Sequence, residues 1–66
     1  MRLCINGRDR DAPALATVAD LVRWLDLPAF GCAVELNGRV VRRPEYPGTG
    51  LGEGDRLEVV RLVGGG

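Results

Sequence analysis

Residues 57–63 read Leu-Glu-Val-Val-Arg-Leu-Val and lead directly into Gly64-Gly65-Gly66. The stretch is apolar and rich in β-branched residues, which is typical of a β-strand. Because side chains alternate across a strand, Leu57 and Val59 are predicted to face the core, and Glu58 and Val60 the opposite side. A strand this apolar is expected near the middle of its sheet.

Two further segments predict β-hairpins. Residues 1–5 alternate, with the odd-numbered side chains on one face, and Asn6-Gly7 supplies the tight turn. Asn-Gly suits such a turn because both central residues need a positive φ. Residues 8–12 return with charged side chains and meet a proline, which favours an edge strand. Residues 32–36 and 39–41 repeat the pattern around Asn37-Gly38.

One short amphipathic helix is predicted between the hairpins. Thr17 is expected to cap its first turn, with Asp20 returning the hydrogen bond or favouring the helix dipole. Pro28 ends the helix after about two to three turns. The apolar stripe consists of Val18, Leu21, Val22 and Leu25.

The segment 42–54 is rich in glycine and proline and is predicted to be a loop. Its glycines precede a strand and not a helix, so they indicate turns and not a phosphate-binding loop.

A single helix must cover one face of a mixed sheet of four to five strands. If the last strand lies beside the first, the two run parallel with the helix in the crossover. The expected architecture is an α+β β-grasp fold over residues 1–63, followed by a flexible glycine tail over 64–66.

The composition argues against an independent enzyme. Among its 66 residues the chain has no His, Lys, Ser or Gln, which removes the usual general base, the Schiff-base amine and the serine nucleophile. Cys4 and Cys32 are too few for a zinc site, so no metal is expected. Alternation places their thiols on opposite faces of the sheet, so we predict no disulfide.

Charge and hydropathy limit the partners and the cellular compartment that we expect. The formal net charge is zero, which gives no indication of nucleic-acid or membrane binding. No apolar run is long enough for a membrane span, and the first residues lack a signal-peptide pattern. We therefore expect a cytoplasmic protein that is monomeric when free.

The glycines that follow the strand predict a reactive end. A carboxylate that attacks the α-phosphate of ATP becomes an acyl adenylate, and residues without a Cβ pass through a narrow channel in the adenylating enzyme. On this interpretation Gly66 is the reactive residue, and Gly64 and Gly65 form the tail. Frayed glycine at a chain end is the plain structural alternative.

The whole chain resembles the ThiS family of sulfur carriers for thiamine biosynthesis, which are ubiquitin-like proteins. The resemblance rests on the order and spacing of several short stretches. These are Asn6-Gly7, Thr17-Val18 before Leu21, residues 33–38, Val40-Val41, Arg43, Glu45-Tyr46, residues 54–60 and residues 63–66. Pro44, Pro47, Gly48 and Gly50 depart from the family's short helical turn, so a looser loop is expected there.

The resemblance implies a carrier that partner enzymes modify. A ThiF-type adenylating enzyme, related to ubiquitin-activating enzymes, would adenylate Gly66 with its own ATP and magnesium. The carrier itself would bind no cofactor. Sulfur from a cysteine desulfurase would convert the carboxylate to a thiocarboxylate, and a ThiG-type thiazole synthase would accept that sulfur.

Three alternatives stay open. Related carriers serve molybdopterin synthesis, tRNA thiolation or cysteine synthesis. A ubiquitin-like modifier would form isopeptide bonds instead, although a chain without lysine cannot form lysine-linked chains on itself. A simple β-grasp binding module would not need its glycines, because fold alone does not fix function.

The face of the sheet without the helix is predicted to dock the partner near the tail. Exposed apolar side chains that gather on one face commonly mark an interface. Charged neighbours are expected to form a polar rim around them. The apolar candidates are Val60, Leu62 and Val63, and the rim candidates are Glu58, Arg2 and Arg56.

Overall fold

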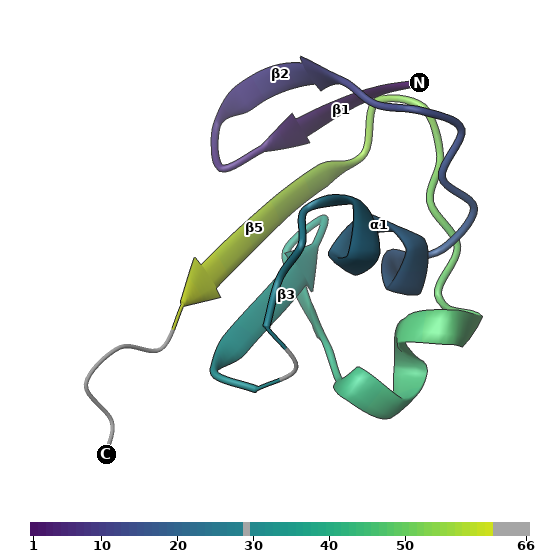
Figure 1. Ribbon diagram of the computed structural model, residues 1–66. Helices are drawn as coiled ribbons and strands as arrows, with labels where there is room; N and C mark the ends of the chain where they lie inside the picture. The colour runs from purple at the N-terminus through teal and green to yellow at the C-terminus, as the bar shows by residue number, and fades with distance from the viewer. Residues whose placement is uncertain (29, 62–66) are drawn as a thin grey trace.

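The computed structural model describes residues 1–28 and 30–61, which form one mixed sheet with a helix above it (Figure 1). The sheet has five strands in the order β2-β1-β5-β3-β4. This is the β-grasp arrangement that the sequence predicts. The elements are β1 (Arg2–Ile5), β2 (Arg8–Asp11), α1 (Val18–Trp24), β3 (Cys32–Leu36), β4 (Arg39–Val41), the 3-10 helix η1 (Arg43–Gly48) and β5 (Arg56–Arg61).

The last strand, β5, is the centre of the sheet. It runs parallel to β1 at Cys4↔Arg56 and Ile5↔Leu57, and antiparallel to β3 from Cys32↔Arg61 to Leu36↔Leu57. The charged strand β2 is one edge, as predicted. The predicted boundary between the domain and its tail, at residue 63, lies outside the described residues.

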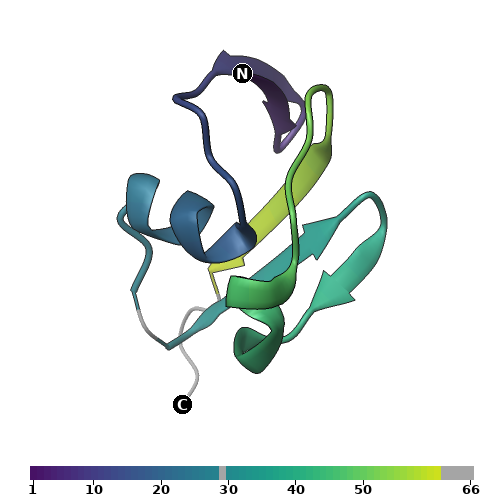
Figure 2. The same cartoon turned by 90° about the vertical axis from the view of Figure 1, so that its right-hand side faces the viewer.

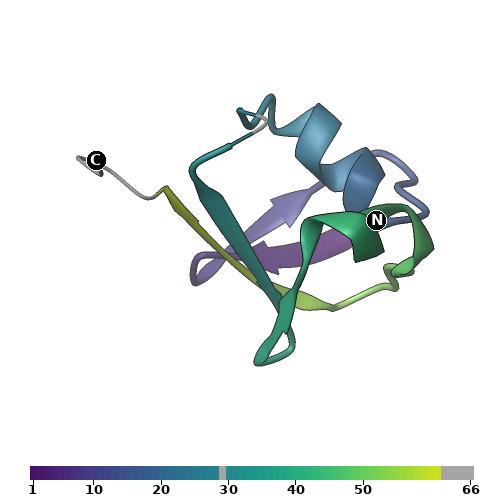
Figure 3. The same cartoon turned by 90° about the horizontal axis from the view of Figure 1, so that it is seen from below.

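The core lies between the sheet and α1. Figure 2 and Figure 3 show α1 on one side of the sheet, whereas no helix of the described residues covers the opposite face. Side chains at alternate positions of the strands meet the apolar stripe of the helix, as their spacing predicts. The buried residues are Leu3, Ile5, Ala12, Val18, Leu21, Val34, Val41 and Leu57.

Residues 43–48 differ from the expected loose loop and form the 3-10 helix η1. The Glu45 side chain accepts a hydrogen bond from the Arg42 N–H at 2.8 Å, and the Thr49 hydroxyl donates to the Glu45 carbonyl at 2.7 Å. Pro44 stands in the first turn, where its fixed φ suits a helix and its missing N–H costs nothing. Pro44 is therefore compatible with the start of this helix, and the expectation of a looser loop is wrong.

A capping box begins α1. The Asp20 N–H donates to Thr17 Oγ1 at 3.3 Å, and the Asp20 carboxylate accepts from the N–H groups of Thr17 and Ala16 at 3.1 and 3.0 Å. The hydrogen bond from Arg23 is the main cause that lowers the pKa of Asp20, and these backbone bonds add to it. The ionised Asp20 carboxylate therefore stabilises the fold at pH values above its pKa in the unfolded chain. This contribution is lost as the pH falls through the pKa of Asp20 in the folded protein.

We predict that Thr17→Ala lowers the free energy of unfolding by about 1 kcal/mol, because the first turn of α1 loses its side-chain acceptor. Urea denaturation of the two proteins measures the difference. Thr17→Ser keeps the hydroxyl and is the matched control, expected close to the natural chain. Equal stability of all three proteins would contradict a contribution from this cap.

Candidate functional site

The strand β5, which precedes the glycines in the sequence, is described up to Arg61. The predicted tail and docking residues at 62–66, which include Leu62, Val63, Gly64, Gly65 and Gly66, lie outside the described residues. In Figure 1 the end of β5 extends beyond the hairpin of β1 and β2 and lies next to β3. The end of β5 is therefore the described part of the chain that lies nearest to the glycines in the sequence.

Side-chain alternation along β5 is as predicted. Leu57 is buried and Val59 is half-buried on the helix side, where it packs against the core. Glu58 and Val60 lie on the helix-free face, and 49% of Val60 is exposed. Val60 is one of the large exposed hydrophobic residues in the described chain, together with Phe30 and Val40.

The four candidate residues of this face in the described chain do not form one group. Glu58 and Val60 are neighbours on one side of β5, and Arg56 follows in the same row at about 13 Å from Val60, at 3.3 Å per residue. Arg2 lies at the far end of the strand, where its carbonyl accepts from the Gly54 N–H at 2.8 Å. The expectation that Arg2 lies near Val60 is therefore wrong.

Arg2 has a local role instead. Its guanidinium donates to the Asp11 carboxylate on β2 at 2.9 Å, and its backbone N–H donates to Glu53 at 2.9 Å. The hydrogen bond and charge of Asp11 raise the pKa of Arg2, and those of Arg2 lower the pKa of Asp11. Arg2 thus joins the edge hairpin to the loop before β5.

Glu35 is a neighbour of the candidate site that the sequence did not reveal. It stands directly opposite Glu58 in the pairing of β3 with β5, and Ala33 stands opposite Val60. Both carboxylates belong to the helix-free face, and directly opposed like charges weaken a sheet. The ion pairs in the described part of the chain join Arg2 to Asp11 and Arg23 to Asp20, so neither involves these glutamates. These two carboxylates lie beside Val60 in the pairing of β3 with β5, and Arg56 shares a hollow with them.

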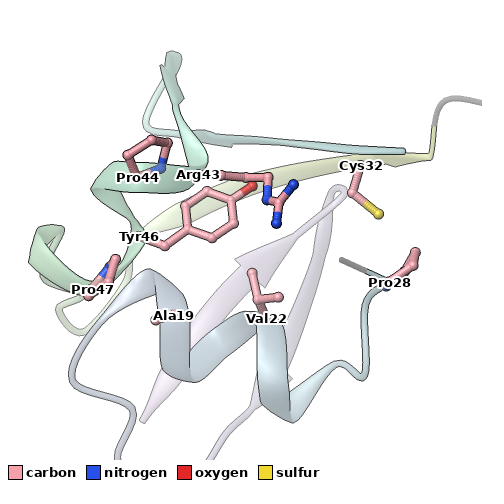
Figure 4. Close-up of a pocket in the computed structure, with 8 residues that line it drawn as sticks. All are labelled: Ala19, Val22, Pro28, Cys32, Arg43, Pro44, Tyr46 and Pro47. Atoms are coloured by element: carbon pink, nitrogen blue, oxygen red, sulfur yellow. The ribbon is translucent and has the colours of Figure 1, made fainter. Parts of the chain in front are cut away.

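A cavity of about 610 Å³ opens on the other side of the sheet, between α1 and η1 (Figure 4). The polar groups of its lining come from Cys32, Arg43 and Tyr46. Burial raises the pKa of the Tyr46 hydroxyl. Apart from these groups its lining is apolar. The remaining lining residues are Ala19, Val22, Pro28, Pro44 and Pro47.

The cysteines lie on opposite faces, as predicted. Cys32 faces the cavity beside α1, whereas Cys4 shares a hollow on the helix-free side with Glu35, Arg56 and Glu58. Both thiols are free. This placement on opposite sides of the sheet is the one from which the absence of a disulfide is predicted.

Two negative findings apply to residues 1–28 and 30–61. No group of three or more Cys, Asp or Glu side chains could hold a metal ion there. Within the same residues, no helix has both the length and the hydropathy needed to cross a membrane.

The sequence of residues 3–66 matches the family model described as "ThiS family". The match spans the β-grasp body, the row of residues around Val60 and the terminal glycines. The chain belongs to the ThiS family. A solved structure agrees: the thiamine biosynthesis protein ThiS of Geobacter metallireducens is 32% identical, and the superposition covers 100% of both chains with a TM-score of 0.83.

Two curated relatives carry a different name. Proteins named thiazole synthase from Paramagnetospirillum magneticum and Magnetococcus marinus are each 38% identical to this ThiS-family chain over 66 residues. The match covers 100% of this chain and 20% of each of those proteins. The chain thus spans about a fifth of the length of these two relatives.

Proposed function

We propose that this chain is a sulfur carrier for the synthesis of the thiazole ring of thiamine. The observation that carries the proposal is the family match, which extends through the glycines that follow β5. The likeness over the full length of a protein named for thiamine biosynthesis supports it. In this function the chain is a co-substrate of partner enzymes and not an enzyme.

The chemistry takes place at the carboxylate of Gly66. One carboxylate oxygen attacks the α-phosphate of ATP and forms an acyl adenylate as pyrophosphate leaves. The outer sulfur of the donor's persulfide then attacks the acyl carbon and displaces AMP, which forms an acyl disulfide. A thiol attacks the donor's sulfur in that S–S bond, so that the thiocarboxylate leaves and the thiol and the donor end as a disulfide. ATP and magnesium are held by the partner, so the chain needs no cofactor of its own. Without a Cβ, the tail fits a narrow channel.

Three partners follow from this scheme. A ThiF-type enzyme adenylates Gly66, a cysteine desulfurase provides the sulfur, and a ThiG-type thiazole synthase accepts it. The two relatives named thiazole synthase support the last of these partners. The carrier is expected to work in the cytoplasm and to be monomeric between encounters.

The partner is proposed to dock on the helix-free face beside the tail. Val60 supplies the exposed apolar contact, and Glu58 lies beside it. With Glu35 opposite Glu58, the face favours a partner surface that carries basic side chains.

Intact-mass measurement of the protein from its native host tests the proposed function. We expect a species whose mass corresponds to the replacement of one oxygen atom by sulfur. Treatment with an alkylating reagent should convert this species to the alkylated thiocarboxylate. Deletion of the gene should create a requirement for the thiazole precursor. A thiocarboxylate in a protein whose gene deletion creates no thiazole requirement would assign the chain to molybdopterin synthesis, tRNA thiolation or cysteine synthesis. Isopeptide conjugates of the chain would indicate a protein modifier.

A further inference from the structure

The side chain of Asn6 is bonded to the backbone of the strand that bears the tail. Its Nδ2 donates to the Val59 carbonyl at 3.1 Å, and its Oδ1 accepts from the Val59 N–H at 2.7 Å. One amide group thereby satisfies both backbone groups of a residue, as a residue of a neighbouring strand would.

This contact occurs where β5 extends beyond the end of β1, while it stays paired with β3 on its other side. β1 pairs with β5 at Arg56 and Leu57, and the Asn6 N–H still donates to the Leu57 carbonyl at 2.9 Å. The chain then turns back into β2, and the end of β5 continues past the hairpin (Figure 1). The Asn6 side chain extends the ladder by one more position, to Val59.

The other Asn-Gly turn provides an internal comparison. Asn37 Oδ1 accepts from the Arg56 N–H at 3.0 Å, and its Nδ2 donates to Asp55 at 3.1 Å. Asn6 and Asn37 have φ values of 52° and 51°, a backbone conformation that glycine also adopts readily. The turns therefore accept glycine, and the two amides hold β5 at its beginning and close to its end.

We propose that Asn6 is a positioning residue for the reaction at the tail. The inference rests on the proposed function. Val59 stands two residues before Arg61, where the described strand ends and the chain continues towards Gly66. By holding Val59 in register, Asn6 sets the point and direction from which the carboxylate reaches ATP on the partner. Small misplacements of reacting groups lower rates steeply.

The matched pair Asn6→Gly and Asn37→Gly tests this role, because each variant keeps a glycine-compatible turn and loses two side-chain hydrogen bonds to other residues. We would measure denaturant unfolding, hydrogen exchange at the Val59 amide, and pyrophosphate release with magnesium-ATP and the ThiF-type enzyme of the host. For Asn6→Gly we expect exchange about tenfold faster. We expect its kcat/KM, with carrier as the varied substrate, to fall by about tenfold or more.

Asn37→Gly should lose similar stability and keep nearly the natural rate of pyrophosphate release, because it acts at the other end of β5. Asn6→Asp keeps the acceptor for the Val59 N–H but loses the donor, so it should release pyrophosphate at an intermediate rate; it also serves if Asn6→Gly does not fold. Equal rates for both glycine variants, or a natural rate for Asn6→Asp, would overturn the inference while leaving the proposed function intact. No release from the natural chain would overturn the proposed function itself.

Discussion

Removal of Gly66 is expected to abolish adenylation of the carrier and leave its fold unchanged. The deletion shortens the tail by one residue, so the new carboxylate no longer reaches the α-phosphate of ATP. Within residues 1–28 and 30–61, which the structure describes, the strands, the helices and the buried residues all precede the deleted position. Pyrophosphate release with the ThiF-type enzyme measures the first effect, and thermal unfolding measures the second.

Gly65→Leu should have nearly the same effect, because a bulky side chain would block the narrow channel that we propose for the tail. Gly48→Ala is a control on the body of the protein, since an added Cβ at that position meets no atom within 4 Å. It should keep both the rate and the melting temperature. Normal pyrophosphate release by the protein without Gly66 would show that the tail is not the reactive group.

The architecture could be predicted because its signals are local and repeat along the chain. Alternation assigns Leu57 to the core and Val60 to the other face without knowledge of any neighbouring strand. The capping box at Thr17 and Asp20 involves residues three apart, so it too can be recognised in the sequence. Each of these predictions depends on a short stretch of chain.

Contacts between distant strands could not be predicted in this way. The opposition of Glu35 and Glu58 depends on the register of β3 against β5, which alternation alone leaves open. The same uncertainty placed Arg2 near Val60, although the register of β1 puts it beside Gly54. The hydrogen bonds from the Asn6 side chain to the Val59 backbone join residues 53 positions apart, so alternation along the sequence could not predict them.

The 3-10 helix was missed for a different reason. Four turn-forming residues, Pro44, Pro47, Gly48 and Gly50, indicated an irregular loop. The outcome depends on Glu45 and Thr49, whose side chains bond to the Arg42 N–H just before the helix and to the Glu45 carbonyl within it. Composition describes a segment's tendency, whereas these two contacts decide its conformation.

The function, in contrast, was suggested by a stretch with little structural content. Gly64-Gly65-Gly66 have no side chains, so this stretch carries no hydrophobic pattern from which a strand or helix could be predicted. Their meaning comes from the chemistry that a bare carboxylate permits and from the family to which the chain belongs. In the proposed function, the partner recognises the folded body through the surface beside β5.

Val60→Asp is expected to weaken binding to the adenylating enzyme by at least about tenfold and to change stability little. Val60 is 49% exposed on the helix-free face, so aspartate there keeps access to water in the free protein. In the complex the new charge would replace an apolar contact and stand beside Glu58. Titration calorimetry of the carrier with the ThiF-type enzyme measures the change in affinity.

The adjacent position provides the matched control, because Val59→Asp places the same group on the other side of the strand. Val59 packs against the core, so this variant should lower the melting temperature sharply through burial of an unpaired charge. The two substitutions thus separate docking from stability with one chemical change at neighbouring residues. A large fall in melting temperature for Val60→Asp with unchanged binding would assign Val60 to the core and shift the register of β5 by one residue. If Val60→Asp changes neither binding nor stability, the docking surface lies elsewhere than on this face. If it weakens binding alone, the docking surface includes the end of β5.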